Sequence, residues 1–275
     1  MAEGMEFVYP TKGQSWGIVG MIILSTLVFI PVSLSLDGIA GKELSFLTYY
    51  VLAMGVPFLI AHKQRKKRGH LNGYNFDFSS PKTIALVSFS IIGIQVGVIV
   101  PIVSLIPMPD FMKAIFREFA ERDGVFSFIA VVVAAPVLEE LIFRGIILNG
   151  LLKKYSPLNS IILSSVLFGI VHLNPWQFVA ALMVGIFSGW VYYRTQKLML
   201  SIIIHSVNNL LAFVSTSFVD TETMMDAAFS EFYGGSLNFI IVTGSAICLG
   251  VTCLFLLKNE FQNLRVNSGS TQSYL

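Results

Sequence analysis

The sequence contains few charged residues, few cysteines and no zinc-protease motif. Charged side chains make up 12% of its 275 residues, about half of the roughly 25% found in a typical soluble domain. This scarcity excludes a protein whose whole surface faces water. The net charge of +2 is too small to indicate a nucleic-acid partner. The 55% of residues that are hydrophobic instead favour a membrane protein.

The two cysteines, Cys248 and Cys253, lie on one apolar segment. A step of five residues turns a helix by about 500°, so their side chains point to different faces. We therefore expect neither a disulfide nor a shared metal site from them. The sequence also lacks His-Glu-x-x-His, in which two histidines one helical turn apart hold zinc.

Apolar segments of about 20 residues, the length needed to cross a bilayer as a helix, occupy most of the chain. The sequence predicts eight spans, over 16–36, 44–61, 83–106, 125–148, 158–173, 176–194, 199–219 and 237–257. We expect an all-α polytopic fold, with one membrane domain over 1–275 whose motif core is 125–219, and a flexible cytoplasmic tail over 259–275. Apolar residues at helical spacing in 110–122 indicate an interfacial amphipathic helix or an ordinary connector.

Two pairs of glycines in the predicted spans have the four-residue spacing that lets helices pack closely in lipid. They are Gly93 with Gly97 and Gly185 with Gly189. We expect both pairs to serve packing. The pattern does not indicate an oligomeric state.

Lysine and arginine occur in every second predicted loop, at 63–68, 153–154, 194–197 and 258–265. The loop at 220–231 contains four acidic residues and no lysine or arginine. Because cytoplasmic loops of membrane proteins are enriched in lysine and arginine, the basic loops and both termini are expected in the cytoplasm. The protein is expected in a cell membrane or an endomembrane, in contact with lipid.

The fourth predicted span contains Glu139, Glu140 and Arg144. An acid or base at the centre of a bilayer costs about 2.5–3.5 kcal/mol on insertion scales, so such residues usually have partners and a function. Glu140 and Arg144 are one helical turn apart and can pair. Glu139 lies about 100° around the helix from Glu140, which leaves it free to point elsewhere, unless it is merely solvated near the interface.

Two other spans contain polar side chains. The fifth ends with Phe168 and His172, and the seventh contains His205, Asn208 and Asn209. A histidine satisfied within the core, and amides that only join neighbouring helices, are the alternative explanations. Together the three spans supply a carboxylate, two imidazoles and an amide, which suit activation of water and stabilisation of an oxyanion.

The motifs Glu-Glu-x-x-x-Arg at 139–144, Phe-x-x-x-His at 168–172 and His-x-x-x-Asn at 205–209 occur in this order on separate spans. As a set they resemble the CAAX-processing and bacteriocin-processing membrane peptidases, also called the Abi family. The resemblance implies an intramembrane glutamic endopeptidase that acts on a peptide or lipidated protein and needs no metal or other cofactor.

The same resemblance assigns roles to individual residues. It implies that Glu139 is the general base and that His172 orients the attacking water. His205 and Asn209 would stabilise the oxyanion. Glu140 and Arg144 would brace the helix, and Phe168 belongs to the histidine motif. The different roles implied for Glu139 and Glu140 agree with their spacing, because Glu140 is the one placed to neutralise Arg144.

Three other functions are compatible with these residues. A zinc peptidase would use the histidines and glutamates as ligands, a transporter would use them as an ion path, and an immunity or scaffold protein would only bind a peptide. One difficulty concerns His172, which lies late in its span while Glu139 and His205 lie toward the cytoplasmic side, a mismatch in depth of roughly 10 Å. Either the fifth span is strongly tilted and displaced or its predicted boundaries are wrong, and we expect a tilt around a water-filled cone that opens to the cytoplasm.

Overall fold

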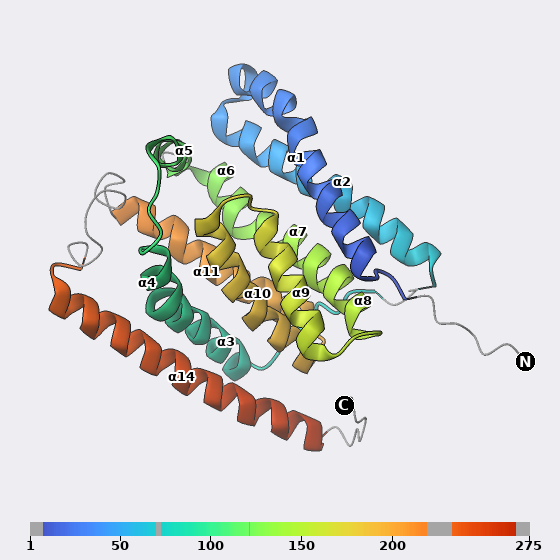
Figure 1. Ribbon diagram of the computed structural model, residues 1–275, viewed down its shortest axis with the longest axis vertical. Coiled ribbons are helices and arrows are strands. Elements are labelled where there is room, and N and C mark those ends of the chain that lie inside the picture. The colour runs from blue at the N-terminus through green and yellow to red at the C-terminus, as the bar shows by residue number, and fades with distance from the viewer. Residues whose placement is uncertain (1–7, 70–72, 121, 219–232, 268–275) are drawn as a thin grey trace, which may run out of the picture.

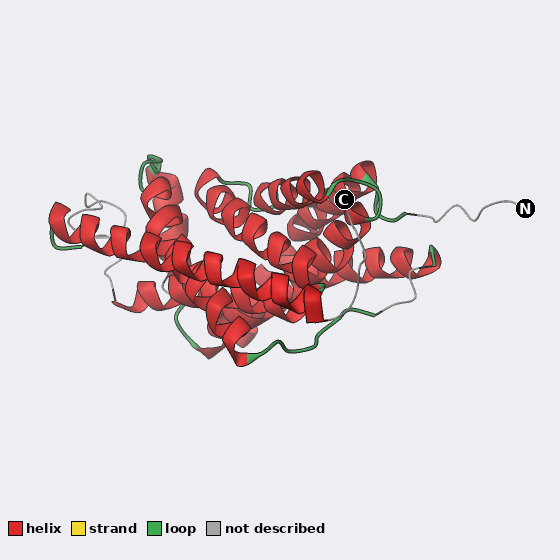
Figure 2. Ribbon diagram, turned by 90° about the horizontal axis from the view of Figure 1, so that it is seen from below, coloured by secondary structure: helices red, strands yellow, loops and turns green. Residues whose placement is uncertain are grey.

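The structure, a computed structural model, describes residues 8–69, 73–120, 122–218 and 233–267. Every regular element among these residues is a helix, as Figure 2 shows. Seven helical stretches in the described part of the chain are long and apolar enough to cross a membrane. The all-α polytopic membrane fold predicted from the sequence is confirmed.

The first helices form a hairpin beside the rest of the bundle (Figure 1). The elements before the fourth span are α1 (Lys12–Ala40), α2 (Lys42–Lys67), α3 (Pro81–Ile94), η1 (Gln95–Ile99), α4 (Val100–Val103) and α5 (Asp110–Ala120). The fourth span comprises α6 (Val125–Phe128), η2 (Ile129–Ala134), α7 (Ala135–Glu140), η3 (Leu141–Leu148) and α8 (Asn149–Leu152). The remaining helices are α9 (Pro157–Ile170), α10 (Pro175–Thr195), α11 (Leu198–Phe218) and α14 (Ser236–Asn267).

Three helices begin with the same local signal, a capping side chain followed by proline. Ser80, Ser156 and Asn174 each accept a hydrogen bond from a backbone N–H in the first turn, at the starts of α3, α9 and α10. The proline that follows each cap has a suitable φ and lacks an N–H that the helix would leave unpaired in any case. These pairs explain why the helices begin where they do.

The fifth predicted span, 158–173, does not cross a membrane by itself. Helix α9 has 14 residues and is about 21 Å long at 1.5 Å per residue, whereas the hydrocarbon core is about 30 Å thick. The sequence therefore predicts one full span too many. Because α9 ends at Ile170, His172 lies in the turn before α10, partway along the bundle.

The basic loops lie together at one end of the bundle, where α2, α8 and α10 end. The Lys82 ammonium lies 2.6 Å from the Glu260 carboxylate, and the Leu198 N–H donates to the Asn75 carbonyl at 2.8 Å. Figure 1 shows α1 beginning and α14 ending in the same direction along the bundle. We call this end the basic end and the other the opposite end.

Both glycine pairs pack helices closely, as predicted. A Cβ on Gly93 would lie 2.6 Å from the Cα of Gly250 on α14. A Cβ on Gly185 would lie 2.9 Å from the Cβ of Ser165 on α9. Contacts this short leave no room for a larger residue, so both pairs serve packing within the chain.

The expected start of the C-terminal tail differs from the structure. Helix α14 continues to Asn267, so the expected tail boundary at 259 lies inside a helix, and 268–275 lie outside the described residues. The acidic loop at 220–231 also lies outside them. The amphipathic helix expected over 110–122 is present as α5, which Figure 1 shows end-on, across the direction of the spans.

Candidate active site

The fourth span is a continuous helix in which two π-helical segments, η2 and η3, flank the turn of α7 that contains Glu139 and Glu140. Glu139 is 7% exposed and Glu140 is fully buried, so Glu139 is not merely a solvated residue near the interface. Turns of π-helix, which are wider than α-helical turns, are uncommon overall but occur frequently at functional sites.

Asn209 satisfies a backbone group that Pro136 leaves without a donor. In η2 the Ala135 N–H donates to the Ala130 carbonyl, five residues back. The same pattern would pair the Val131 carbonyl with residue 136, but proline has no N–H. The Asn209 amide nitrogen donates to the Val131 carbonyl at 2.9 Å instead. One amide hydrogen of Asn209 is therefore used to join α11 to the fourth span.

Glu140, Arg144 and His205 form a buried polar group. The Arg144 Nη1 donates to Glu140 Oε1 at 2.9 Å, which confirms the predicted pair. His205 Nδ1 lies 3.1 Å from the same oxygen. Because a carboxylate only accepts, Nδ1 carries the hydrogen, and the other ring nitrogen, Nε2, is turned away from Glu140.

Glu139 has different partners from its neighbour. Its Oε1 accepts a hydrogen bond from the Tyr50 hydroxyl on α2. Its Oε2 lies 3.7 Å from His205 Nε2, too far for a direct hydrogen bond, and has no hydrogen-bond partner among the described residues. One carboxylate oxygen is thus held by Tyr50, and the other faces His205.

Tyr50 is the site residue that sequence reasoning missed. A tyrosine in an apolar span is common and gives no signal by its type. The available clue was the hydroxyl group of a tyrosine in the second span at the depth of the glutamates. Nothing in the sequence showed, however, that α2 would pack beside α7.

The ring of Phe168 joins the two histidines. Its centroid lies 5.3 Å from that of His172 and 5.4 Å from that of His205, both edge-on. The Arg144 guanidinium lies over the same ring, 4.8 Å from its centroid. His172 therefore contacts the group around Glu139 through Phe168, from a position just beyond the end of the short helix α9.

His172 is oriented by the end of its own helix. Its Nδ1 lies 2.9 Å from the Phe168 carbonyl, and since a carbonyl only accepts, Nδ1 carries the hydrogen. In the neutral ring Nε2 is then an acceptor. The next residue, Leu173, has φ 57°, in the left-handed region that non-glycine residues seldom adopt, and this conformation turns the chain toward α10.

The structure thus connects the predicted residues to different degrees. Hydrogen bonds and close charge contacts link Glu139, Glu140, Arg144 and His205, while His172 joins them through Phe168 and Asn209 through Val131. Asn208 is buried, and its Oδ1 has no partner among the described residues. Within the described ranges, no three His, Cys, Asp or Glu side chains are placed to hold a metal ion.

Comparisons with known proteins agree with the motifs. Residues 121–211 match the family model described as "Type II CAAX prenyl endopeptidase Rce1-like", a segment that includes all three motifs. This match confirms the family resemblance predicted from the sequence and supports a membrane peptidase of some kind.

Two curated proteins match shorter segments. The Bacillus subtilis (strain 168) protein named "Putative membrane peptidase YdiL" is 34% identical over 77 residues, 28% of this chain and 32% of the relative. The Lactococcus lactis subsp. lactis (strain IL1403) protein named "UPF0177 protein YxdF" is 31% identical over 90 residues, 32% of this chain and 49% of the relative. The matches thus span about a third and about half of these relatives. No solved structure matches the chain significantly.

Proposed function

We propose that the protein is an intramembrane endopeptidase that hydrolyses a peptide bond with a water activated by Glu139. The observation that carries this proposal is the difference between the environments of the two buried glutamates. Each has one oxygen without a hydrogen-bond partner among the described residues. Glu140 is neutralised by Arg144 at 2.9 Å, whereas Glu139 has no ion pair with a lysine or arginine in the described part of the chain. Glu139 is held at its other oxygen by Tyr50. A general base needs this combination of a fixed position and a free acceptor.

In the proposed reaction a water bridges Glu139 Oε2 and His205 Nε2, whose 3.7 Å separation is longer than a direct hydrogen bond. Glu139 takes one proton from the water as the water oxygen attacks the carbonyl carbon of the peptide bond. The electrons of the C=O π bond move to the carbonyl oxygen. When the tetrahedral intermediate collapses, the C–N bond breaks and Glu139 returns the proton to the leaving nitrogen. The products are a carboxylic acid and an amine.

The remaining groups orient and stabilise. His172 Nε2 is free to accept from the water, and Asn209 has a second amide hydrogen beyond the one given to Val131. We propose His172 as the residue that orients the water, and Asn209 with His205 as the groups that donate to the oxyanion, a role in which the His205 ring carries a hydrogen on Nε2 as well as on Nδ1. Glu140 and Arg144 hold His205 and the helix in place, and the ring of Phe168 contacts both imidazoles.

We also propose that the basic end and both termini face the cytoplasm, because lysine and arginine mark cytoplasmic loops. The loops at 63–68, 153–154 and 194–197 all lie at that end. The substrate is a membrane-associated peptide or lipidated protein in contact with lipid.

Purified protein should cleave a substrate peptide without a metal. The test is incubation in lipid nanodiscs with a farnesylated C-a-a-X peptide and, separately, a double-glycine leader peptide, followed by mass spectrometry. We expect an internal cut in one of them, at an unchanged rate in EDTA or phenanthroline. Loss of cleavage on chelation, restored by zinc, would support the metallopeptidase instead. No cut in either peptide, and no altered protein in the membrane proteome of a deletion strain, would contradict proteolysis.

Removing the Tyr50 hydroxyl should slow catalysis more than it weakens binding. A hydrogen bond to a charged group contributes about 1.5–3 kcal/mol, so Tyr50→Phe is expected to lower kcat about 10-fold or more, with KM little changed. The adjacent Tyr49 provides a matched control, because its hydroxyl donates to the Thr26 carbonyl at 3.3 Å. Tyr49→Phe should keep the original kcat, and equal rates for the two variants would exclude this role for Tyr50.

A further inference from the structure

Helix α5 has one apolar and one charged face, and the proposed reaction does not use it. It connects two candidate spans, Pro81–Val103 and Val125–Leu152, and lies across their direction (Figure 1). At 100° per residue its side chains separate into two arcs of about 140° each. The apolar arc contains Phe111, Met112, Ile115 and Phe116. The charged arc contains Asp110, Lys113, Arg117 and Glu118.

One edge of the apolar face packs against the bundle. The ring of Phe116 lies edge-on to that of Trp176, with the centroids 6.4 Å apart. Trp176 lies in the first turn of α10, and its Nε1 donates to the Ile106 carbonyl, just before α5, at 3.1 Å. Helix α5 is therefore attached to the start of a candidate span. Tryptophan is enriched at the ends of spans, at the level of the lipid headgroups, so this contact places α5 at that level.

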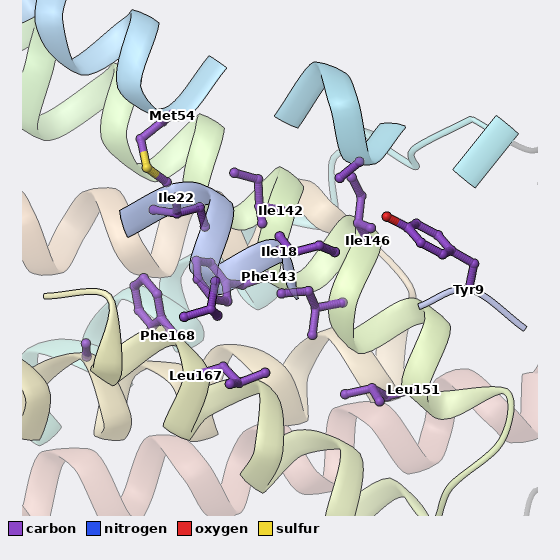
Figure 3. Close-up of a cluster of buried hydrophobic side chains, with 14 residues drawn as sticks. Tyr9, Ile18, Ile22, Met54, Ile142, Phe143, Ile146, Leu151, Leu167 and Phe168 are labelled. Atoms are coloured by element: carbon purple, nitrogen blue, oxygen red, sulfur yellow. The ribbon is translucent and has the colours of Figure 1, made fainter. Parts of the chain in front are cut away.

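The other edge of the apolar face is exposed. Phe111 is 67% exposed and Ile115 is 56% exposed. The buried apolar side chains of the bundle form three clusters among the described residues, one of which extends from Phe168 to Tyr9 (Figure 3). Phe111 and Ile115 belong to none of these clusters. Since water is an unfavourable environment for large apolar side chains, this edge of α5 needs an apolar partner.

The neighbouring surface of the chain indicates which partner this is. Leu105, before α5, is 81% exposed, and Val125, which begins the fourth span, is 71% exposed. Both lie at the ends of candidate spans, where exposed apolar side chains face lipid. The exposed edge of α5 lies between them along the chain. On the other face, the side chains of Asp110 and Glu118 are fully exposed and 60% exposed.

We infer that α5 lies in the interfacial layer of the bilayer at the opposite end, parallel to the membrane surface, with Phe111 and Ile115 inserted into the lipid. A helix with an apolar face toward acyl chains and a charged face toward water adopts this position. The partner is the lipid surface itself, bound by apolar contact. The charge on Glu118 is paired within the chain, with Arg122 at 3.0 Å. The inference does not depend on the proposed function.

The depth of α5 can be measured with spin labels on the full chain. In a background with Cys248→Ala and Cys253→Ala, nitroxide labels are attached to Phe111→Cys and Ile115→Cys. Ala114→Cys is the matched control, because Ala114 is also exposed and lies on the charged face. Each labelled protein is placed in nanodiscs of phosphatidylcholine. Power saturation then measures its collisions with oxygen, which concentrates in hydrocarbon, and with a water-soluble nickel chelate.

The ratio of oxygen to nickel collisions should be about 5-fold higher or more at Phe111→Cys and Ile115→Cys than at Ala114→Cys, because the apolar face is in lipid. A ratio at either position equal to that of Ala114→Cys would place this edge of α5 in water and overturn the inference. Few collisions with both reagents would also overturn it, since protein would then cover the face. A peptidase and a protein without peptidase activity should give the same result.

Discussion

Glu139→Gln is expected to lower the rate of peptide cleavage by about 1,000-fold or more, without unfolding the protein. Glutamine has the same shape and its carbonyl oxygen can still accept from Tyr50, but an amide cannot take a proton from water. General-base catalysis contributes about 10²- to 10⁴-fold to rates. The measurement is the initial rate of cleavage together with the melting temperature in detergent.

Glu260→Gln is the control for the loss of a carboxylate from a membrane helix. Glu260 pairs with Lys82 at 2.6 Å at the basic end, far along the chain from the site. Its substitution should change neither the cleavage rate nor the KM by more than about twofold. A Glu139→Gln enzyme with a substantial rate would remove Glu139 from the chemistry, even if the protein proved to be a peptidase.

Arg144→Leu is expected to destabilise the fold more than any other single change in the site. Arg144 is completely buried, and its loss would leave the Glu140 carboxylate in an apolar environment with only His205 beside it. Breaking a buried pair by removing one partner destabilises by about 3–5 kcal/mol. The contact between the guanidinium and Phe168 would also be lost. Chemical unfolding in mixed micelles measures the change.

Arg122→Leu is a closely matched control. Arg122 also pairs with an acid one turn away, Glu118 at 3.0 Å, and its guanidinium lies over a ring, that of Phe46 at 5.5 Å. In that pair the Glu118 side chain is 60% exposed and Arg122 is 18% exposed, against 0% for both partners of the Arg144 pair, and pairs open to solvent contribute about 0–1 kcal/mol. Equal destabilisation by the two substitutions would contradict a special role for burial of Arg144.

Much of the fold follows from the sequence because a bilayer imposes a simple rule on helix length. Among the described residues, seven of the predicted spans are helices long and apolar enough to cross a membrane, and the Gly93 and Gly185 contacts follow from residue size. Helix α9 was harder to predict. Its apolar character continues through Ile170 and Val171, so hydropathy extends the segment, whereas the turn at His172 and the cap at Asn174 end the helix early.

The site was predictable to the extent that residues interact along one helix. The Glu140–Arg144 pair follows from one-turn spacing. Contacts between helices were not predictable in the same way, since no spacing shows that Tyr50 meets Glu139. The role of Asn209 depends on the missing N–H of Pro136 and on the five-residue hydrogen-bond pattern of η2. That pattern could not be predicted from the side chains.

A structure of the protein with a peptide aldehyde hydrate, made from whichever peptide it cleaves, would test the central claim most directly. Such a hydrate has two oxygens on one carbon, as the tetrahedral intermediate does. We predict one oxygen within hydrogen-bond distance of Glu139 and the other beside His205 or Asn209, with His172 in contact with the first. A hydrate bound elsewhere, or Glu139 and His172 too far apart to touch one molecule, would contradict the account.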